Sequence, residues 1–317
     1  MKLVKDTISK IGIFRLTLFC FIYIAIASLA ITFTRVNILK NGKANFDSDS
    51  GFYVLGQSDK NAVLLPIRKD GAIMPVFSAQ SVLAVDLTSD AVLIEKNPDE
   101  PILPASTTKI ATALVALDHY PLDKILKVNG ISVEGQKMEL VQGEEISVEN
   151  LLYGLLVYSA NDAAEVLAQN FPGGRDLFIS LMNSKTRQLG LKNTSFSNPT
   201  GLDGDGHWTT ANDLIKIAKV AMENPIFSEM VATREVEVSS IDGKYTHKMI
   251  NINKLLGSVD GVMGVKTGWT ENAKENLVSY VKREDREVMI AVLGSQDRFG
   301  ETSLLIDWVF ANYEWGR

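Results

Sequence analysis

The chain has 317 residues, of which 46% are hydrophobic and 22% are charged, so its composition is that of a globular protein with one large domain or two modest ones. Its net charge of −6 gives no basic surface for nucleic acid, and we exclude nucleic acid as a partner. Cys20 is the only cysteine, and the histidines show no metal-ligand spacing, so we expect neither a metal nor a cofactor.

The N-terminal segment differs from the rest of the chain. Residues 16–33 carry no charge and lie between Arg15 and Arg35. A run of about 18 residues is just long enough to cross a bilayer core as a helix. We therefore predict that residues 1–36 form an uncleaved membrane anchor with a cytoplasmic N-terminus. The alternative is a cleaved signal segment, because Ala25-Ile-Ala27 is a small-residue cleavage pattern.

A polar segment follows, and then the folded domain is expected to begin. Residues 37–76 are rich in Asn, Asp, Ser, Gly and Lys, which is typical of a linker outside the membrane. We expect residues 77–317 to form the folded domain. Its first elements are apolar runs at 81–87 and 91–95, separated by a turn-like Thr-Ser-Asp, which predicts a hairpin.

The centre of the domain is predicted to be helical. Residues 106–117 follow a proline and are almost wholly apolar, and a helix that is apolar on all sides belongs in the middle of a large core. The remaining predicted elements are helices over 149–168, 175–189 and 210–222, strands over 262–268, 276–281 and 286–293, and an amphipathic helix over 301–313. This order indicates an α+β fold in which N- and C-terminal strands share one sheet.

Ser106 and Lys109 are the first candidates for chemistry. They are three residues apart at the start of a predicted helix, so their side chains share one face. Serine is a weak nucleophile until a base accepts its proton, and a lysine whose pKa is lowered by burial can be that base. The helix N-terminus would add N–H groups for a developing oxyanion. Taken alone, the pair is explained more simply by a helix cap and a surface lysine.

Two further short elements could contribute polar groups to the same site. Ser159-Ala-Asn161 interrupts an apolar helix, and its serine could relay a proton while its amide binds a substrate amide. Lys266-Thr-Gly268 ends an apolar strand, where a lysine and a hydroxyl could bind a carboxylate and a glycine lets a ligand approach closely. Taken alone, the first is a helix junction and the second a turn after a strand.

The three elements together are far more specific than each alone. They occur in the order and context typical of class A β-lactamases and penicillin-binding proteins, with the serine on a helix and the lysine on a strand. Their surroundings resemble the low-molecular-mass penicillin-binding proteins, the serine-type D-alanyl-D-alanine carboxypeptidases, over roughly residues 77–313. The resembling blocks are Pro104 to Leu114, Tyr158 to Ala164, Asn198 to Leu202 with His207, and Gly261 to Thr270.

The resemblance implies a β-lactamase/transpeptidase-like fold, in which an antiparallel sheet carries a helical subdomain. It also implies that Ser106 forms an acyl-enzyme with the penultimate D-alanine and that Lys109 acts as its base. Ser159 would assist proton transfer, and Asn161 would bind the substrate. Peptidoglycan stem peptides are then the expected substrate, and β-lactam antibiotics are expected covalent inhibitors.

On the strand, the resemblance implies that Lys266 and Thr267 hold the terminal carboxylate beside Gly268. The backbone N–H groups of Ser106 and Trp269 would form the oxyanion hole. The expected location is the bacterial cell membrane, with the catalytic domain on its outer side.

The sequence also departs from the family pattern. It ends about 50 residues after Lys266, which leaves no room for the additional C-terminal domain and membrane helix of larger carboxypeptidases, so we expect the N-terminal span to replace that anchor. The family usually has a glycine where Lys274 stands.

Three alternatives to the carboxypeptidase prediction can be weighed from the sequence. A β-lactamase would need a Glu-x-x-Leu-Asn element between Asn161 and Lys266, and none is present. A D,D-endopeptidase that cuts cross-links would use the same motifs and stays open. A catalytically silent peptidoglycan binder would be expected to lack Ser106 or Lys109, and both are present.

Overall fold

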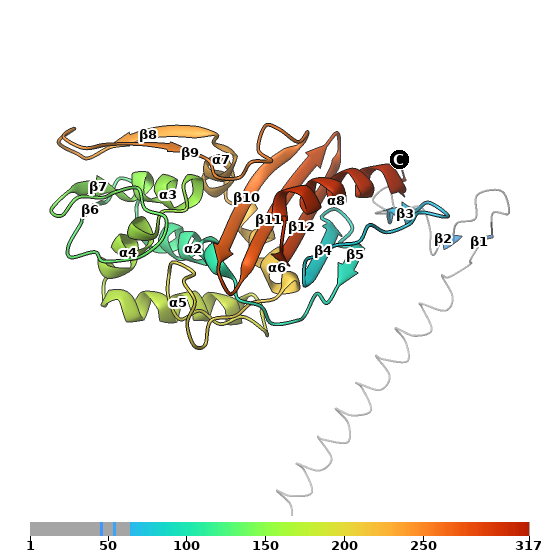
Figure 1. Ribbon diagram of the computed structural model, residues 1–317, viewed down its shortest axis with the longest axis horizontal. Helices are drawn as coiled ribbons and strands as arrows, with labels where there is room; N and C mark the ends of the chain where they lie inside the picture. Colours follow the sequence, from blue (N-terminus) through green and yellow to red (C-terminus); the bar gives the residue numbers. More distant parts are fainter. Residues whose placement is uncertain (1–44, 47–52, 55–63, 317) are drawn as a thin grey trace, which may run out of the picture. The chain divides into compact units, whose positions relative to one another are not determined.

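The computed structural model describes residues 45–46, 53–54 and 64–316 (Figure 1). The chain divides into two compact units, residues 1–62 and 63–317. In the first unit, β1 (Asn45–Phe46) pairs antiparallel with β2 (Tyr53–Val54). The predicted membrane segment lies outside the described residues. Among the residues that are described, no helix has both the length and the apolar character needed to span a bilayer.

The second unit contains a sheet, several helices and short strand pairs. Its strands are β3 (Ile67–Arg68), β4 (Ser81–Asp86), β5 (Val92–Lys96), β6 (Ile125–Lys127), β7 (Glu145–Ser147), β8 (Glu235–Ser239), β9 (Thr246–Ile250), β10 (Val262–Thr270), β11 (Lys274–Arg283), β12 (Arg286–Ser295) and β13 (Tyr313–Glu314). Its helices are the 3-10 turn η1 (Ala105–Thr108) and α2 (Lys109–His119), α3 (Val148–Val157), α4 (Asn161–Gln169), α5 (Gly174–Gln188), α6 (Ala211–Met222), α7 (Pro225–Ala232) and α8 (Arg298–Asn312).

The main sheet joins strands from both ends of the domain. Its order is β10-β11-β12-β4-β5, and every neighbouring pair is antiparallel. Strand β4 of the N-terminal hairpin pairs with β12, with Ala84 opposite Ile290. The predictions of a mixed fold and of one sheet shared by N- and C-terminal strands are therefore confirmed.

Both faces of this sheet are buried, which explains its continuous apolar runs. In β4, Val82 and Ala84 belong to one hydrophobic core and Leu83 and Val85 to another, because side chains alternate along a strand. Helix α8 packs on the first of these faces and α6 on the second, so the sheet lies between two cores (Figure 1).

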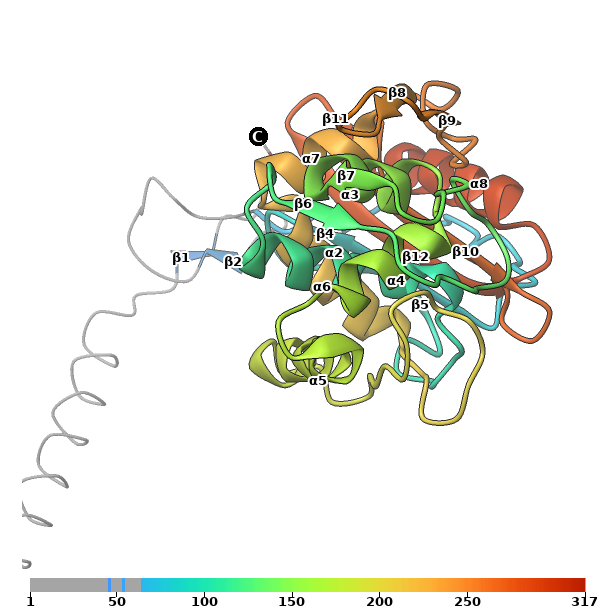
Figure 2. The ribbon, with the colours of Figure 1, turned by 90° about the vertical axis from the view of Figure 1, so that its left-hand side faces the viewer.

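Helix α2 runs through the middle of the helical part, as its apolar sequence predicted. Residues 109–116 are all buried, and the helix packs against α3, α5 and α6 (Figure 2). Lys109 is the single charged side chain in this stretch. A fully buried lysine is costly unless other groups stabilise it, so its position indicates a functional role.

The prediction of one helix over residues 149–168 was wrong, because two helices, α3 and α4, occupy this range. The chain breaks between them at Ser159, whose φ of +63° is left-handed. Non-glycine residues rarely adopt this conformation, and such residues concentrate at functional sites. Helix α3 begins at a capping serine, Ser147, which accepts from the Asn150 N–H.

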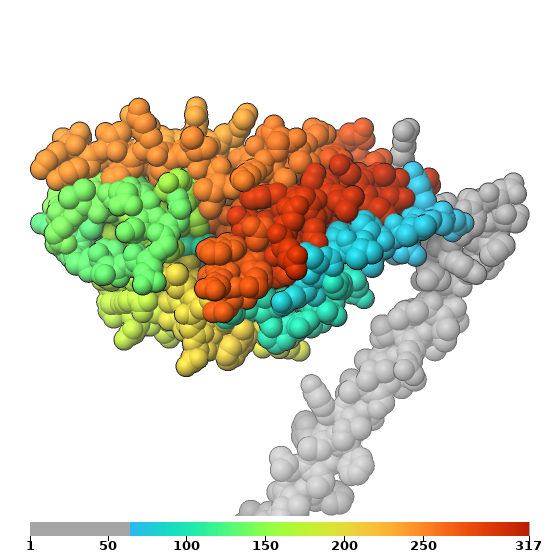
Figure 3. Space-filling model, viewed as in Figure 1, coloured from blue at the N-terminus to red at the C-terminus, as the bar shows by residue number. Residues whose placement is uncertain are grey.

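Several elements have weak sequence signals and were not predicted. The β8–β9 hairpin lies along one edge of the unit next to α3 (Figure 3). Strand β3, at 67–68, pairs with the C-terminal β13, so this part of the expected linker belongs to the second compact unit. Lys274, at the position where a glycine was expected, adopts a φ of +57° at the start of β11.

Candidate active site

The nucleophile candidate stands at the junction of η1 and α2. Ser106 lies in η1, and Lys109 is the first residue of α2, with its Nζ 2.8 Å from Ser106 Oγ. The Lys109 side chain is completely buried. Ala105, immediately before the serine, has a left-handed φ of +47°. The spacing of three residues therefore places the hydroxyl and the amine in direct contact, as predicted.

Lys109 Nζ has two further contacts, both from distant parts of the chain. It lies 2.6 Å from Asn161 Oδ1 at the start of α4 and 2.5 Å from the backbone carbonyl of Thr200. Burial lowers the pKa of Lys109 well below its usual value, and the positive charge of Lys266 lowers the pKa further. The amine therefore loses its proton more readily than an exposed lysine does.

A second buried lysine joins the other two predicted elements. Lys266 Nζ of β10 donates to Ser159 Oγ (2.8 Å) and to the Thr267 carbonyl (3.1 Å). Burial, followed by the positive charge of Arg298, lowers the pKa of Lys266 to about 7. The site thus contains two serine–lysine pairs, one on the helical side and one bridging to the sheet.

Two glycines let the surrounding segments approach the nucleophile closely. A Cβ on Gly268 of β10 would lie 3.0 Å from Ser106 N and from the Pro104 carbonyl. A Cβ on Gly201 would lie 1.9 Å from the Ala105 carbonyl. The sequence predicted that Gly268 makes room for a ligand. In the structure it makes room for the turn that carries the nucleophile, residues 104–106, and so brings Ser106 N next to β10.

The predicted residues converge on one cleft of about 920 Å³. Ser106, Ser159, Asn161, Thr267, Gly268 and Trp269 line it. Lys109 and Lys266 lie behind this lining and reach it through Ser106 and Ser159. Trp269 stands at the open side with 61% of its surface exposed. Among the described residues, no cluster of His, Cys, Asp and Glu is arranged to hold a metal ion.

The chemistry of this arrangement is nucleophilic. It combines a hydroxyl, an amine of lowered pKa in contact with it, and a second lysine, Lys266, that can hold an anionic group; Lys266 lies in the middle of β10 and not at the end of a strand as predicted. A family model described as D-alanyl-D-alanine carboxypeptidase matches residues 69–297. The chain belongs to this family. The resemblance found in the sequence is therefore confirmed.

Individual relatives agree with the family assignment. The chain is 33% identical over 247 residues to the D-alanyl-D-alanine carboxypeptidase DacF of Bacillus subtilis, covering 74% of this chain and 63% of the relative. It is 34% identical to DacB2 of Mycobacterium tuberculosis, covering 75% of this chain and 84% of the relative. The chain thus spans less than two thirds of the Bacillus protein.

A solved structure supports the same fold. The Streptomyces K15 DD-transpeptidase superposes with a TM-score of 0.71 at 30% identity, covering 75% of this chain and 99% of that chain.

Arg298 and the Thr200 carbonyl, which contact the predicted residues of the site, were not themselves predicted as site residues. Arg298, the first residue of α8, lines the cleft and donates from Nη1 to the Gly268 carbonyl (3.1 Å). Thr200 contributes only its backbone carbonyl. No local sequence pattern predicts either group. Arg298 reaches the site only through the packing of α8 on the sheet, and every residue type has a backbone carbonyl. Thr200 does lie in the resembling block Asn198 to Leu202.

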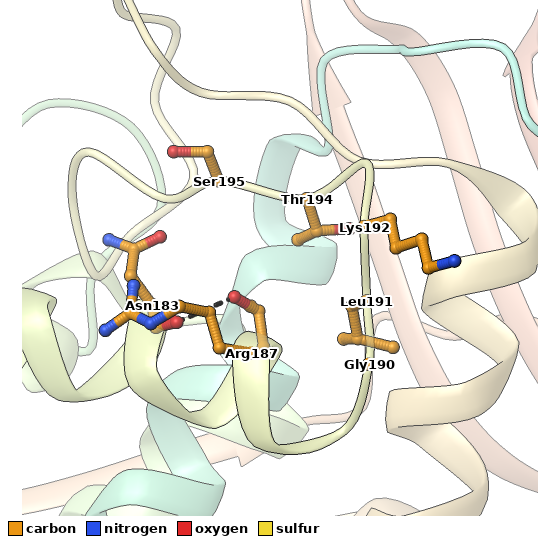
Figure 4. A pocket seen from close by; sticks show the side chains of 8 residues that line it. Asn183, Arg187, Gly190, Leu191, Lys192, Thr194 and Ser195 are labelled. Carbon is orange, nitrogen blue, oxygen red and sulfur yellow. Dashed lines mark hydrogen bonds between the residues drawn. The ribbon is translucent and has the colours of Figure 1, made fainter. Parts of the chain in front are cut away.

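A second hollow, of about 470 Å³, lies away from these motifs (Figure 4). It is formed by the end of α5 and the loop after it, including Arg187, Lys192 and Ser195. Thr186 there donates its hydroxyl to the Asn183 carbonyl (2.8 Å). None of the predicted site residues lines this hollow.

Proposed function

We propose that this chain is a serine-type D-alanyl-D-alanine carboxypeptidase, which removes the terminal D-alanine from peptidoglycan stem peptides through an acyl-enzyme on Ser106. The observation that carries the proposal is the contact between Ser106 Oγ and the buried Lys109 amine. Both lie beside a cleft whose strand β10 presents a second buried lysine, Lys266.

Lys109 acts as the base for acylation. Burial favours its neutral form, whose lone pair accepts the Ser106 hydroxyl proton while Oγ attacks the carbonyl carbon of the penultimate D-alanine. The oxyanion that forms is stabilised by the backbone N–H groups of Ser106 and Trp269. The closeness of Gly268 to Ser106 N supports this assignment, because Gly268 precedes Trp269 and brings the backbone of β10 next to that of the nucleophile.

The Ser159–Lys266 pair returns a proton to the leaving group. The C–N bond breaks, and the leaving nitrogen of D-alanine takes a proton from Ser159 Oγ, which takes one in turn from Lys266 Nζ, while Lys109 keeps the proton of Ser106. Water then attacks the ester and loses a proton, which returns to Lys266 through Ser159; Lys109 gives its proton back to Ser106 Oγ, and the shortened stem leaves as a carboxylate. The carboxylate of the substrate binds Lys266 and Thr267, and Asn161 binds a stem amide.

The same groups would react with β-lactams. A penicillin presents a carboxylate and a strained amide at a similar separation, so it would acylate Ser106 and act as a covalent inhibitor. We further propose that residues 1–36 attach the chain to the cytoplasmic membrane, that the polar residues from 37 up to the second compact unit form the linker, and that this unit, residues 63–317, acts as the catalytic domain outside that membrane. The uncharged run 16–33 supports this placement.

A D,D-endopeptidase is the second candidate. Relatives named D-alanyl-D-alanine endopeptidase, from Pseudomonas aeruginosa and Escherichia coli, are 33% and 34% identical to this chain, as similar as the carboxypeptidases are. Both activities would use the same acylating serine. The carboxypeptidase is preferred because the family model that matches residues 69–297 carries that description.

The test is covalent labelling followed by product analysis. The full chain, purified in detergent, is incubated with a fluorescent penicillin and analysed by intact mass, with Ser106→Ala as the control. One label on Ser106, absent from the control, supports the proposed nucleophile. Release of D-alanine from a pentapeptide stem supports the carboxypeptidase, whereas cleavage of a cross-linked dimer alone supports the endopeptidase. A folded chain that neither labels nor cleaves would refute both.

A further inference from the structure

Residues 196–203, part of the segment between α5 and α6, are hydrogen-bonded to helices α5 and α2. Asn183 of α5 donates from Nδ2 to the Phe196 carbonyl (2.7 Å) and accepts at Oδ1 from the Phe196 N–H (2.9 Å). Thr112 of α2 donates its hydroxyl to the Pro199 carbonyl (2.6 Å). Figure 4 shows Asn183 facing the loop that leads into this segment. The backbone path is therefore fixed at both places.

Within this segment, one side chain organises the turn. Asn198 Oδ1 accepts from Thr200 N (3.1 Å), Thr200 Oγ1 (2.8 Å) and Gly201 N (2.7 Å). Its Nδ2 donates to the Leu202 carbonyl (2.8 Å). Gly201 has a φ of +88° and no room for a Cβ against the Ala105 carbonyl. Asn198 therefore holds the turn at 198–202 together, and Gly201 of this turn packs against Ala105, next to the nucleophile.

The turn presents the Thr200 carbonyl to the base. Lys109 Nζ contacts Thr200 O (2.5 Å) and Asn161 Oδ1 (2.6 Å), in addition to Ser106 Oγ. The Asn161 amide is oriented by its Nδ2, which donates to the Glu134 carbonyl (2.6 Å), so Oδ1 can only accept. A backbone carbonyl also only accepts.

These two acceptors decide where the lone pair of the amine points. A neutral lysine amine has two N–H bonds and one lone pair. When both N–H bonds are taken by Thr200 O and Asn161 Oδ1, the lone pair is left facing Ser106 Oγ. Without one of these acceptors the amine can rotate, and an N–H can face the hydroxyl whose proton it must accept.

We propose that Asn198 is a positioning residue for acylation: by fixing the turn that carries the Thr200 carbonyl, it orients the Lys109 amine towards Ser106. This inference rests on the proposed function, because it concerns the same acylating serine. Asn198 touches neither the base nor the nucleophile in any hydrogen bond of the described residues, so its effect is transmitted entirely through the backbone at Thr200.

Two substitutions separate orientation from charge. Asn198→Ala removes the acceptor for three donors and frees the turn. Asn198→Asp keeps an acceptor oxygen of the same shape, loses the Nδ2 donor to the Leu202 carbonyl and adds a negative charge near the base. Three charged groups already act on the pKa of Lys109: Lys266 of β10 lowers it, and Asp162 and Glu165 of α4 raise it. The charge of Lys109 in turn lowers the pKa of His207.

The matched control is Asn183→Ala. It removes two hydrogen bonds to the backbone of the same segment, at Phe196, but leaves the turn at 198–201 intact. If the segment matters only for stability, Asn183→Ala and Asn198→Ala should behave alike.

The experiment measures the acylation rate of the full chain with a fluorescent penicillin from acidic to alkaline pH, beside thermal unfolding. We expect Asn198→Ala to acylate about a hundredfold more slowly, since a catalytic group misplaced by about 1 Å loses about that much. Asn183→Ala should acylate at the unmodified rate, even if it unfolds at a lower temperature. Asn198→Asp should shift the acidic limb of the pH profile to higher pH, because the added charge raises the pKa of Lys109.

Each other outcome overturns the inference. A folded Asn198→Ala variant with an unchanged rate removes the positioning role, and an equal loss in Asn183→Ala makes the segment merely structural. If Asn198→Ala does not fold, Asn198→Leu, which keeps the size of the side chain but removes the acceptor, replaces it, and an unchanged acylation rate in that variant decides against the positioning role. Failure of the unmodified chain to label at Ser106 would instead refute the proposed function.

Discussion

Lys109→Met tests the base and the fold separately. Methionine is unbranched and similar in length, so it fills the buried site on α2 while removing the amine. The change leaves Asn161 Oδ1 and the Thr200 carbonyl without their donor. An unpaired buried polar group costs about 1–3 kcal/mol, but the substitution also removes a buried amine that burial disfavours when charged. We therefore expect a net destabilisation of about 2 kcal/mol.

The expected effect on acylation is much larger. A general base contributes about 10²–10⁴-fold, which is about 3–5 kcal/mol in the activation free energy. Acylation by a fluorescent penicillin should fall by at least that range, whereas the unfolding temperature should fall by only about 4–8 °C for a domain of this size. Stopped-flow labelling and calorimetry on the same sample would measure both. Acylation within tenfold of the unmodified chain would refute Lys109 as the base.

Three further predictions follow from single contacts. Gly268→Ala should slow acylation and destabilise by about 1–3 kcal/mol, because its Cβ meets Ser106 N at 3.0 Å; unchanged labelling would contradict this contact. Lys266 has a pKa of about 7 in the fold and about 10.4 when unfolded, so the unfolded chain binds more protons between these values and stability should rise with pH there. Urea unfolding should show that rise, and Lys266→Met should reduce it to the part that Lys109, whose pKa is also lowered, contributes. Lys274→Gly should relieve the left-handed φ of +57° and raise the unfolding temperature slightly without changing the labelling rate; a loss of stability would show that the lysine side chain matters more than its backbone.

Much of the site could be predicted because its chemistry uses residues in short local patterns. Ser106 and Lys109 are one helical turn apart, so local geometry alone brings the hydroxyl to the amine. The apolar stretch after them required a buried helix, and α2 is buried. The strands β10, β11 and β12 were predicted from their apolar runs, which their burial between two cores explains.

Other features could not be predicted, since they depend on segments that meet only in the fold. The break at Ser159 has a left-handed residue; the polar residues there indicated a helix junction, but the predicted helix over 149–168 ran through them. Arg298 follows Lys266 by 32 positions in the sequence. It reaches the cleft because α8 packs on the sheet. Its effect on the pKa of Lys266 is a consequence of that packing alone.

The candidate reactive groups could be found in the printed residues alone: a serine and a lysine on one helical face, a second serine with an amide, and a lysine with a hydroxyl on a strand. Their pKa values and their orientation depend on the packing of the folded chain. Burial at the junction of sheet and helices lowers the pKa of both lysines, and the Thr200 carbonyl, 91 residues from Lys109, fixes the direction of its amine. A local apolar pattern can predict that a helix such as α2 is buried, but the distant groups that its lysine meets depend on how the whole chain packs.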